Sequence, residues 1–150
     1  MQSNLYETDF YAWTLEQSQL LQEGNFKHLD IANLVEEIES LGKQQRQELR
    51  NRLGVLIGHL LKWDYQPGKR SKSWRVTIQI QRREIEDLLE DNPSLKSYLP
   101  EAIVKGYRAG LSLVALETPL DYQDLPQECP YALDQLLDSG FPQNLNDRQE

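Results

Sequence analysis

A long row of apolar residues between Ile31 and Leu60 constrains the fold more than any other feature of the sequence. Its members recur at spacings of three and four residues, as on one face of an α-helix, whereas a strand would need a spacing of two. The row comprises Ile31, Leu34, Val35, Ile38, Leu41, Leu49, Leu53, Leu56, Ile57 and Leu60. A helix of about thirty residues is about 45 Å long. Because it cannot bury its apolar face alone, we expect most of the remaining chain to pack around it.

Helix signals on both sides of this row predict several shorter helices. The expected helices run from Phe10, after an N-cap at Thr8 or Asp9, to before Gly24, over about 73–90, from Pro100 to about Glu117, and from Pro130 to before Gly140. Pro67 is expected to end the long helix near Tyr65, because proline cannot continue a helix. Clusters of β-branched residues between turn signals, which a sheet would need, are missing. We therefore predict an all-α fold, an antiparallel bundle of about four to five helices around one long central helix.

The length and composition are typical of one compact domain. The 150 residues are expected to form a single helical domain with an ordered core over about 5–142. No apolar run approaches the roughly eighteen residues that a membrane span requires. The only cysteine is Cys129, so an internal disulfide is excluded. We expect a cytoplasmic protein that does not enter the membrane.

Positive charge is concentrated in one segment of an otherwise acidic chain. The formal net charge is −8, yet residues 62–83 carry +6 between flanks of −4 and −10. Next to Trp74, these basic side chains could bind phosphates and bases, or they could pair with acidic segments of this chain, of a second copy or of another protein. The overall acidity makes nucleic acid the less favoured partner. The candidates for contact with an anion or a partner are Lys69, Arg70, Lys72, Arg75, Arg82 and Arg83.

The middle of the long row is interrupted by polar residues. Gly42, Gln45 and Arg46 lie on the same helical face as the apolar residues and break the row for about two turns. Either the helix kinks or projects into water at this point, or Gln45 and Arg46 form a polar layer at an interface. The row is also longer than the shorter helices can cover. This excess predicts a homodimer.

Residues with catalytic potential are few. Glu37 belongs to an acidic cluster whose simplest interpretation is a solvent-exposed side of the helix. His59 lies at the edge of the apolar row, where the simplest interpretation is a histidine packed at the edge of the core. Their separation of twenty-two residues corresponds to about 33 Å along one helix. Cys129 precedes Pro130, where a helix N-terminus could lower the pKa of a thiol, but no histidine is near in sequence. Metal-ligand spacings and glycine-rich phosphate loops are absent, so we expect no metal site and no cofactor.

Several short strings resemble one protein family. They are Leu5 to Trp13, Asn33 to Gly42, His59 to Trp63 with Gln66-Pro67, Ser71 to Trp74, Arg82-Arg83, Asp91 to Leu95 and Glu128 to Tyr131. In this order, over about residues 5–142, they resemble a cyanobacteria-rich family known as domain of unknown function twenty-nine. The resemblance implies a small helical protein without an assigned activity, and it carries over no catalytic residue. It marks as positions to test Asp9, Trp13, Glu37, His59, Trp63 and Trp74.

The family that this chain resembles often has aliphatic residues inside the long helix, at positions where this chain has Gly54 and Gly58. This difference implies a helix that is locally looser. For the function, we favour a self-associating, all-helical interaction protein without catalytic activity. One alternative is a nucleic-acid-associated regulator or toxin-neutralising protein that uses the basic segment 69–83. Another alternative is an uncharacterised enzyme that uses Glu37 and His59.

Overall fold

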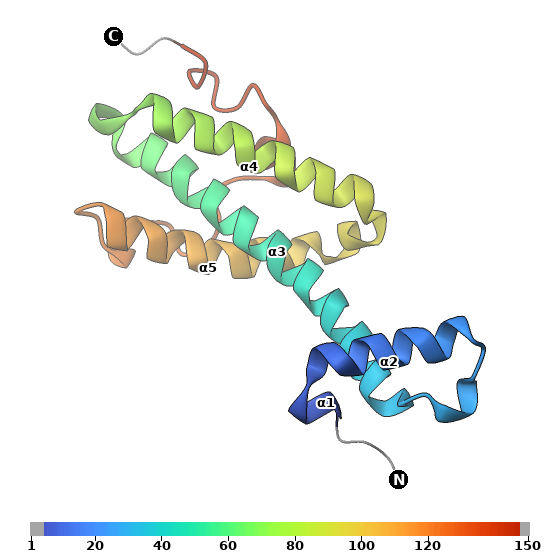
Figure 1. The fold of residues 1–150 in the computed structure, drawn as a ribbon. Helices are drawn as coiled ribbons and strands as arrows, with labels where there is room; N and C mark the ends of the chain where they lie inside the picture. Colours follow the sequence, from blue (N-terminus) through green and yellow to red (C-terminus); the bar gives the residue numbers. More distant parts are fainter. Residues whose placement is uncertain (1–4, 148–150) are drawn as a thin grey trace. The chain divides into compact units, whose positions relative to one another are not determined.

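The computed structural model describes residues 5–147, and within this range it contains helices and connecting segments but no strands. The all-α prediction is therefore confirmed (Figure 1). The α-helices are α1 (Leu5–Thr8), α2 (Phe10–Gln22), α3 (Ile31–Tyr65), α4 (Lys72–Asp91), α5 (Leu99–Glu117) and α6 (Leu133–Leu137). Short 3-10 helices lie between them: η1 (Phe26–His28), η2 (Pro67–Lys69), η3 (Pro93–Tyr98) and η4 (Tyr122–Asp124). In the same described range, no helix is both long enough and apolar enough to cross a membrane.

The predicted long helix is α3, which has 35 residues and ends at Tyr65, two residues before Pro67. It contributes to two compact units, because the contacts within the chain separate between Gln44 and Gln45. We call the described residues 5–44 the first unit and 45–147 the second unit. Each is described separately.

The first unit contains α1, α2, η1 and the beginning of α3, and it has a small interior. Asp9 caps α2 by accepting a hydrogen bond from the backbone N–H of Ala12 at 3.1 Å. Within this unit, only Trp13 and Gln17 are buried. Both contact the start of α3 through Asp30: the Trp13 indole donates to its carboxylate at 3.0 Å, and Gln17 accepts from its backbone N–H at 2.9 Å. Polar contacts therefore carry much of the packing of α2 on α3.

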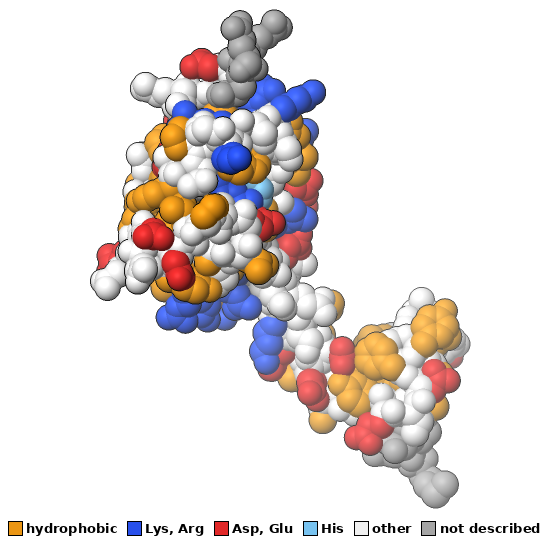
Figure 2. Space-filling model, turned by 90° about the vertical axis from the view of Figure 1, so that its left-hand side faces the viewer, with side chains coloured by type: hydrophobic (Ala, Val, Ile, Leu, Met, Phe, Trp, Pro, Cys, Tyr) orange, Lys and Arg blue, Asp and Glu red, His pale blue; other side chains and the backbone are white. Residues whose placement is uncertain are grey.

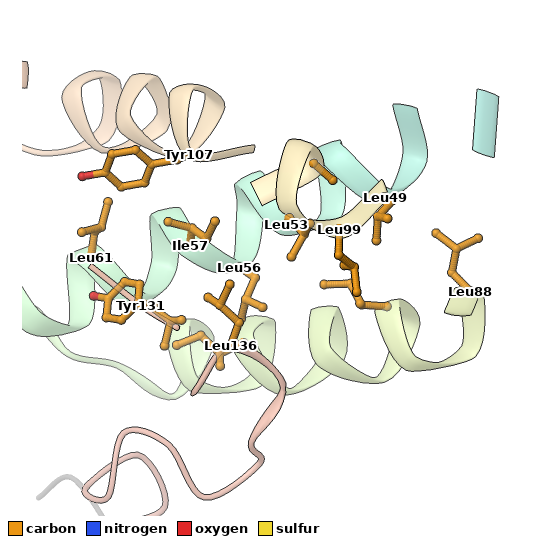
Figure 3. Packing of buried hydrophobic residues seen from close by; sticks show 14 of the residues in the cluster. Leu49, Leu53, Leu56, Ile57, Leu61, Leu88, Leu99, Tyr107, Tyr131 and Leu136 are labelled. Carbon is orange, nitrogen blue, oxygen red and sulfur yellow. The ribbon is translucent and has the colours of Figure 1, made fainter. Parts of the chain in front are cut away.

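The second unit holds the hydrophobic core of the protein. It consists of α3 from Gln45 onward, α4, α5 and the C-terminal segment with η4 and α6. The C-terminal part of the apolar row is buried in it, as the sequence predicts (Figure 3). Side chains from α4, α5 and the C-terminal segment complete this core, with Leu61 close to the rings of Tyr107 and Tyr131. The fully buried residues of the row are Leu49, Leu53, Leu56, Ile57 and Leu60.

Glycines allow α3 and α5 to approach each other closely. A Cβ atom at Gly110 would lie 3.1 Å from both the backbone oxygen of Gly54 and the backbone nitrogen of Gly58. A Cβ atom at Gly106 would lie 3.3 Å from the nitrogen of Gly54. The expectation that α3 is locally looser at Gly54 and Gly58 is therefore wrong. The helix continues through both residues, and the two glycines make room for the backbone of α5.

Candidate interaction surfaces and predicted site residues

The apolar side chains of α3 in the first unit lie at the surface. Ile31, Val35, Ile38 and Leu41, which we call the first-unit apolar face, have exposed fractions from 48% to 66%. They belong to the same row of three- and four-residue spacings whose later members, from Leu49 to Leu60, are buried in the second unit. The expectation that the rest of the chain packs around the whole row thus holds only in the second unit. In the first unit, α1 instead contacts another side of α3, through the hydrogen bond from Tyr6 to Glu37.

Acidic residues surround this face. Residues 1–44 contain eight acidic and two basic residues, a net charge of −6. On α3, Glu36 and Glu39 are exposed and form no hydrogen bond or ion pair with the described residues. Figure 2 shows orange apolar and red acidic side chains intermingled over the first unit. The surface therefore combines apolar area with uncompensated negative charge.

Glu37 has a structural partner within the first unit. Its carboxylate accepts a hydrogen bond from the Tyr6 hydroxyl at 2.5 Å and so joins α1 to α3. This hydrogen bond, with burial and nearby carboxylates, raises the pKa of Tyr6 to about 12. Tyr6 also packs edge-on against Trp13, with ring centroids 4.8 Å apart.

His59 lies in the second unit and is half-buried. Its Nδ1 donates to the backbone oxygen of Val55, one turn earlier, at 2.8 Å, and burial lowers the pKa of the imidazole. Nearby, Lys62 is only 5% exposed, forms an ion pair with Glu117 of α5, and lies 5.5 Å from the centre of the Trp74 ring. Glu37 and His59 thus belong to different units, and each has its own structural partners.

The six predicted basic residues do not form a single group. Arg82 is only 3% exposed and donates to the backbone oxygens of Leu136 and Gln135 at 2.8 and 3.1 Å, so it anchors the C-terminal end of α6. Arg70 donates to the backbone oxygen of Trp63 at 2.8 Å and lies over its ring. The side chains of the other four form no hydrogen bond or ion pair with the described residues, and all four residues are at least partly exposed. We call these four the basic strip: Lys69, Lys72, Arg75 and Arg83.

Trp74 belongs to the packing of the second unit rather than to an open surface. It is half-buried and packs against the hydrophobic core. Its backbone N–H is held by the N-cap residue Ser71 at 3.2 Å. A base could not stack on both faces of this ring without displacing core side chains.

Gln45 and Arg46 lie on an uninterrupted stretch of α3. The helix continues through Gly42, where an added Cβ would meet no atom within 4 Å. Gln45 is half-buried, and the guanidinium of Arg46 lies 4.9 Å from the centre of the Tyr98 ring in the second unit. A polar interface layer at these two residues stays a prediction.

A pocket of about 500 Å³ lies between α5 and the segment around Cys129. The hydroxyls that border it already have partners, because Tyr107 donates to the oxygen of Pro126 and Tyr131 donates to Asp64. Burial raises the pKa of the Cys129 thiol, so the residue does not have the lowered pKa of a reactive nucleophile. This pocket could not be predicted from the sequence, because its walls come from two separate segments of the chain. They are Ile103, Val104, Tyr107, Arg108, Leu111, Gln127, Glu128, Cys129 and Tyr131.

No group of three His, Cys, Asp or Glu side chains in residues 5–147 is arranged to hold a metal ion.

The decisive comparison is with protein families: the family model described as Domain of unknown function DUF29 matches residues 5–142. The chain belongs to this family. The DUF29 match covers the strings on which the resemblance rests and confirms it. No curated protein and no solved structure matches the chain.

Proposed function

We propose that this DUF29 protein is a non-catalytic interaction protein that associates with a second copy of itself through the first-unit apolar face. The observation that carries the proposal is the exposure of Ile31, Val35, Ile38 and Leu41 on a helix whose same side forms the core of the second unit. Covering these side chains is favourable by roughly 1.5–3 kcal/mol for each one that becomes fully buried.

The small interior of the first unit supports this proposal. Only Trp13 and Gln17 are buried there, while further apolar side chains are exposed on α2 and η1: Phe10, Tyr11, Leu15, Leu21 and Phe26. Many exposed large apolar side chains in a small unit are typical of a protein-binding site. A partner would therefore supply the burial that the first unit lacks.

A second candidate function is binding of nucleic acid by the basic strip, as in a regulator or a toxin-neutralising protein. Four basic side chains without partners within the described residues favour it. The net charge of −8 and the packing of Trp74 against the core oppose it. Of the two candidates, self-association agrees better with both the apolar surface and the charge.

The catalytic alternative has less support. The Glu37 carboxylate accepts a hydrogen bond from Tyr6, and Nδ1 of His59 donates to the backbone oxygen of Val55. For the location, we propose the cytoplasm, because a chain with one cysteine gains nothing from an oxidising compartment.

The test of self-association is the molar mass in solution at micromolar concentration, measured by light scattering after size exclusion. We expect the wild-type chain to have twice the mass of one chain and the Ile31→Glu/Ile38→Glu variant to be a monomer. Leu116→Glu is the matched control, because Leu116 lies on α5 and is 86% exposed. It should stay dimeric. Circular dichroism checks that all three are helical.

A monomeric wild-type protein at this concentration would contradict the proposal. So would a dimeric Ile31→Glu/Ile38→Glu variant with wild-type stability, because the first-unit apolar face would then have no part in the association.

A further inference from the structure

We propose that the first-unit apolar face of one copy docks on the basic strip of the second copy, so that two copies exchange this contact reciprocally. The inference rests on the proposed self-association and adds which surfaces meet. Two surfaces of the chain are complementary in charge. The first-unit apolar face lies in an acidic unit, and the basic strip carries positive side chains without acidic partners among the described residues.

Electrostatics favours this pairing over the contact of two identical faces. Each first unit carries a net charge of −6, so two of them placed face to face would repel each other. The basic strip lies in the segment 62–83, which has a net charge of +6. Its four side chains form no ion pair with an acidic residue among the described residues. Glu36 and Glu39 form none with a basic residue there.

The exposed side of α4 also offers apolar contact. Lys72, Val76, Ile80 and Arg83 follow each other at spacings of four, four and three residues and so share one side of the helix. Ile80 is 39% exposed, and Val76 is partly exposed. The alkyl stems of lysine and arginine cover apolar surface while their charged ends reach outward. The strip can therefore cover Ile31 and Ile38 while its charged ends reach toward Glu39, which lies one turn after Val35 at the border of the first-unit apolar face.

Symmetry then fixes the size of the assembly. Each copy has one first-unit apolar face and one basic strip, and in the proposed dimer a two-fold axis relates the two face-to-strip contacts. The expected product is a closed dimer. A single unreciprocated contact would instead leave one face and one strip open and would continue into larger assemblies.

Charge reversal in both surfaces tests the pairing. We expect Lys72→Glu/Arg83→Glu and Glu36→Lys/Glu39→Lys each to weaken the dimer about tenfold or more, because each double reversal removes the charge complementarity of the two surfaces and places like charges opposite each other at the reversed positions. Mixing the two variants should restore a dimer, since each then offers the charge that the other needs. The control Lys96→Glu/Arg108→Glu changes the net charge of the chain equally at exposed residues outside the strip, and it should stay dimeric.

The salt dependence gives an independent readout on the unmodified protein. The dissociation constant should rise between about 0.1 M and about 1 M salt, over which the Debye length falls from about 10 Å to about 3 Å. If two like-charged first units met instead, salt would strengthen the dimer.

The outcomes separate the two proposals. A wild-type monomer contradicts both. A dimer that depends on Ile31 and Ile38 but keeps its affinity in Lys72→Glu/Arg83→Glu overturns only the pairing with the basic strip. Equal weakening by the Lys96→Glu/Arg108→Glu control, or a monomer when the two reversed variants are mixed, overturns it as well. Restored affinity in the mixture, with the expected salt dependence, establishes it.

Discussion

Two side chains of the string His59 to Trp63, those of Lys62 and Trp63, have partners far away in the chain. Trp63 donates from its indole to Asn144 at 2.9 Å, its backbone oxygen accepts from Arg70, and Lys62 pairs with Glu117. These contacts connect α3 to α5 and to the C-terminal segment. They give this string, which is part of the family resemblance, a structural role that needs no catalysis.

Burial of His59 predicts a loss of stability at mildly acidic pH. The pKa of His59 is lowered in the folded protein, whereas an imidazole in the unfolded chain titrates near about 6.5. Below that pH the unfolded state binds more protons, so the free energy of unfolding falls as the pH decreases. We expect His59→Gln to lose part of this dependence in urea denaturation between about pH 7.5 and about pH 5.5.

The control for this prediction is His28→Gln, because His28 is exposed in the first unit. It should keep the pH dependence of the wild-type protein. An unchanged pH dependence in His59→Gln would show that His59 does not contribute.

At the scale of elements, α3 contains glycines in two opposite environments. Gly42 has open space around its Cβ position, whereas a Cβ at Gly54 would lie 3.0 Å from the Cβ of Ala109 and 3.2 Å from the oxygen of Gly106. At Gly42 a side chain could therefore be added without a clash. At Gly54 the missing side chain allows α5 to pack closely against α3.

Alanine substitution should therefore have opposite effects at these two positions. Gly42→Ala should stabilise the protein by about 0.5–1 kcal/mol, since alanine is the better helix former. Gly54→Ala should destabilise it by about 1–3 kcal/mol, since the backbone of α5 would have to move. The free energy of unfolding from urea titration measures both. Equal effects of the two substitutions would contradict the close packing of α3 and α5.

The sequence predicted where the helices lie better than it predicted which of their apolar side chains are buried. The spacing of three and four residues and Pro67 are local signals, and they placed α3 correctly up to Tyr65. Whether Ile38 or Leu53 is buried depends on other segments, and the same spacing occurs in both places. The role of Gly54 was equally hidden, because it depends on Gly106 and Gly110, about fifty residues later.

The predicted site residues show the same limitation. Charge alone grouped Arg82 with Arg83, although adjacent residues of a helix point in different directions. Arg82 is buried under α6, and Arg83 is exposed. A check of the apolar spacing would have helped here, because Arg82 falls on the same side of α4 as the buried Ile78, Ile85 and Leu89.

At the scale of the whole molecule, the two units differ in what they bury and in their charge. The second unit has an extensive core and an unpaired basic strip, and the first unit has a small interior, a net charge of −6 and an exposed apolar face. The proposed association of two copies would account for both properties together.

The most direct measurement is the accessibility of position 38 as the protein concentration changes. A single thiol is placed there by Ile38→Cys in a Cys129→Ser background, and its rate of alkylation is followed from nanomolar to micromolar protein. The account predicts that alkylation slows as the concentration rises, because a second copy covers the first-unit apolar face. A thiol placed by Leu116→Cys in the same background should react at a constant rate. Alkylation at position 38 that is equally fast at every concentration would contradict the account.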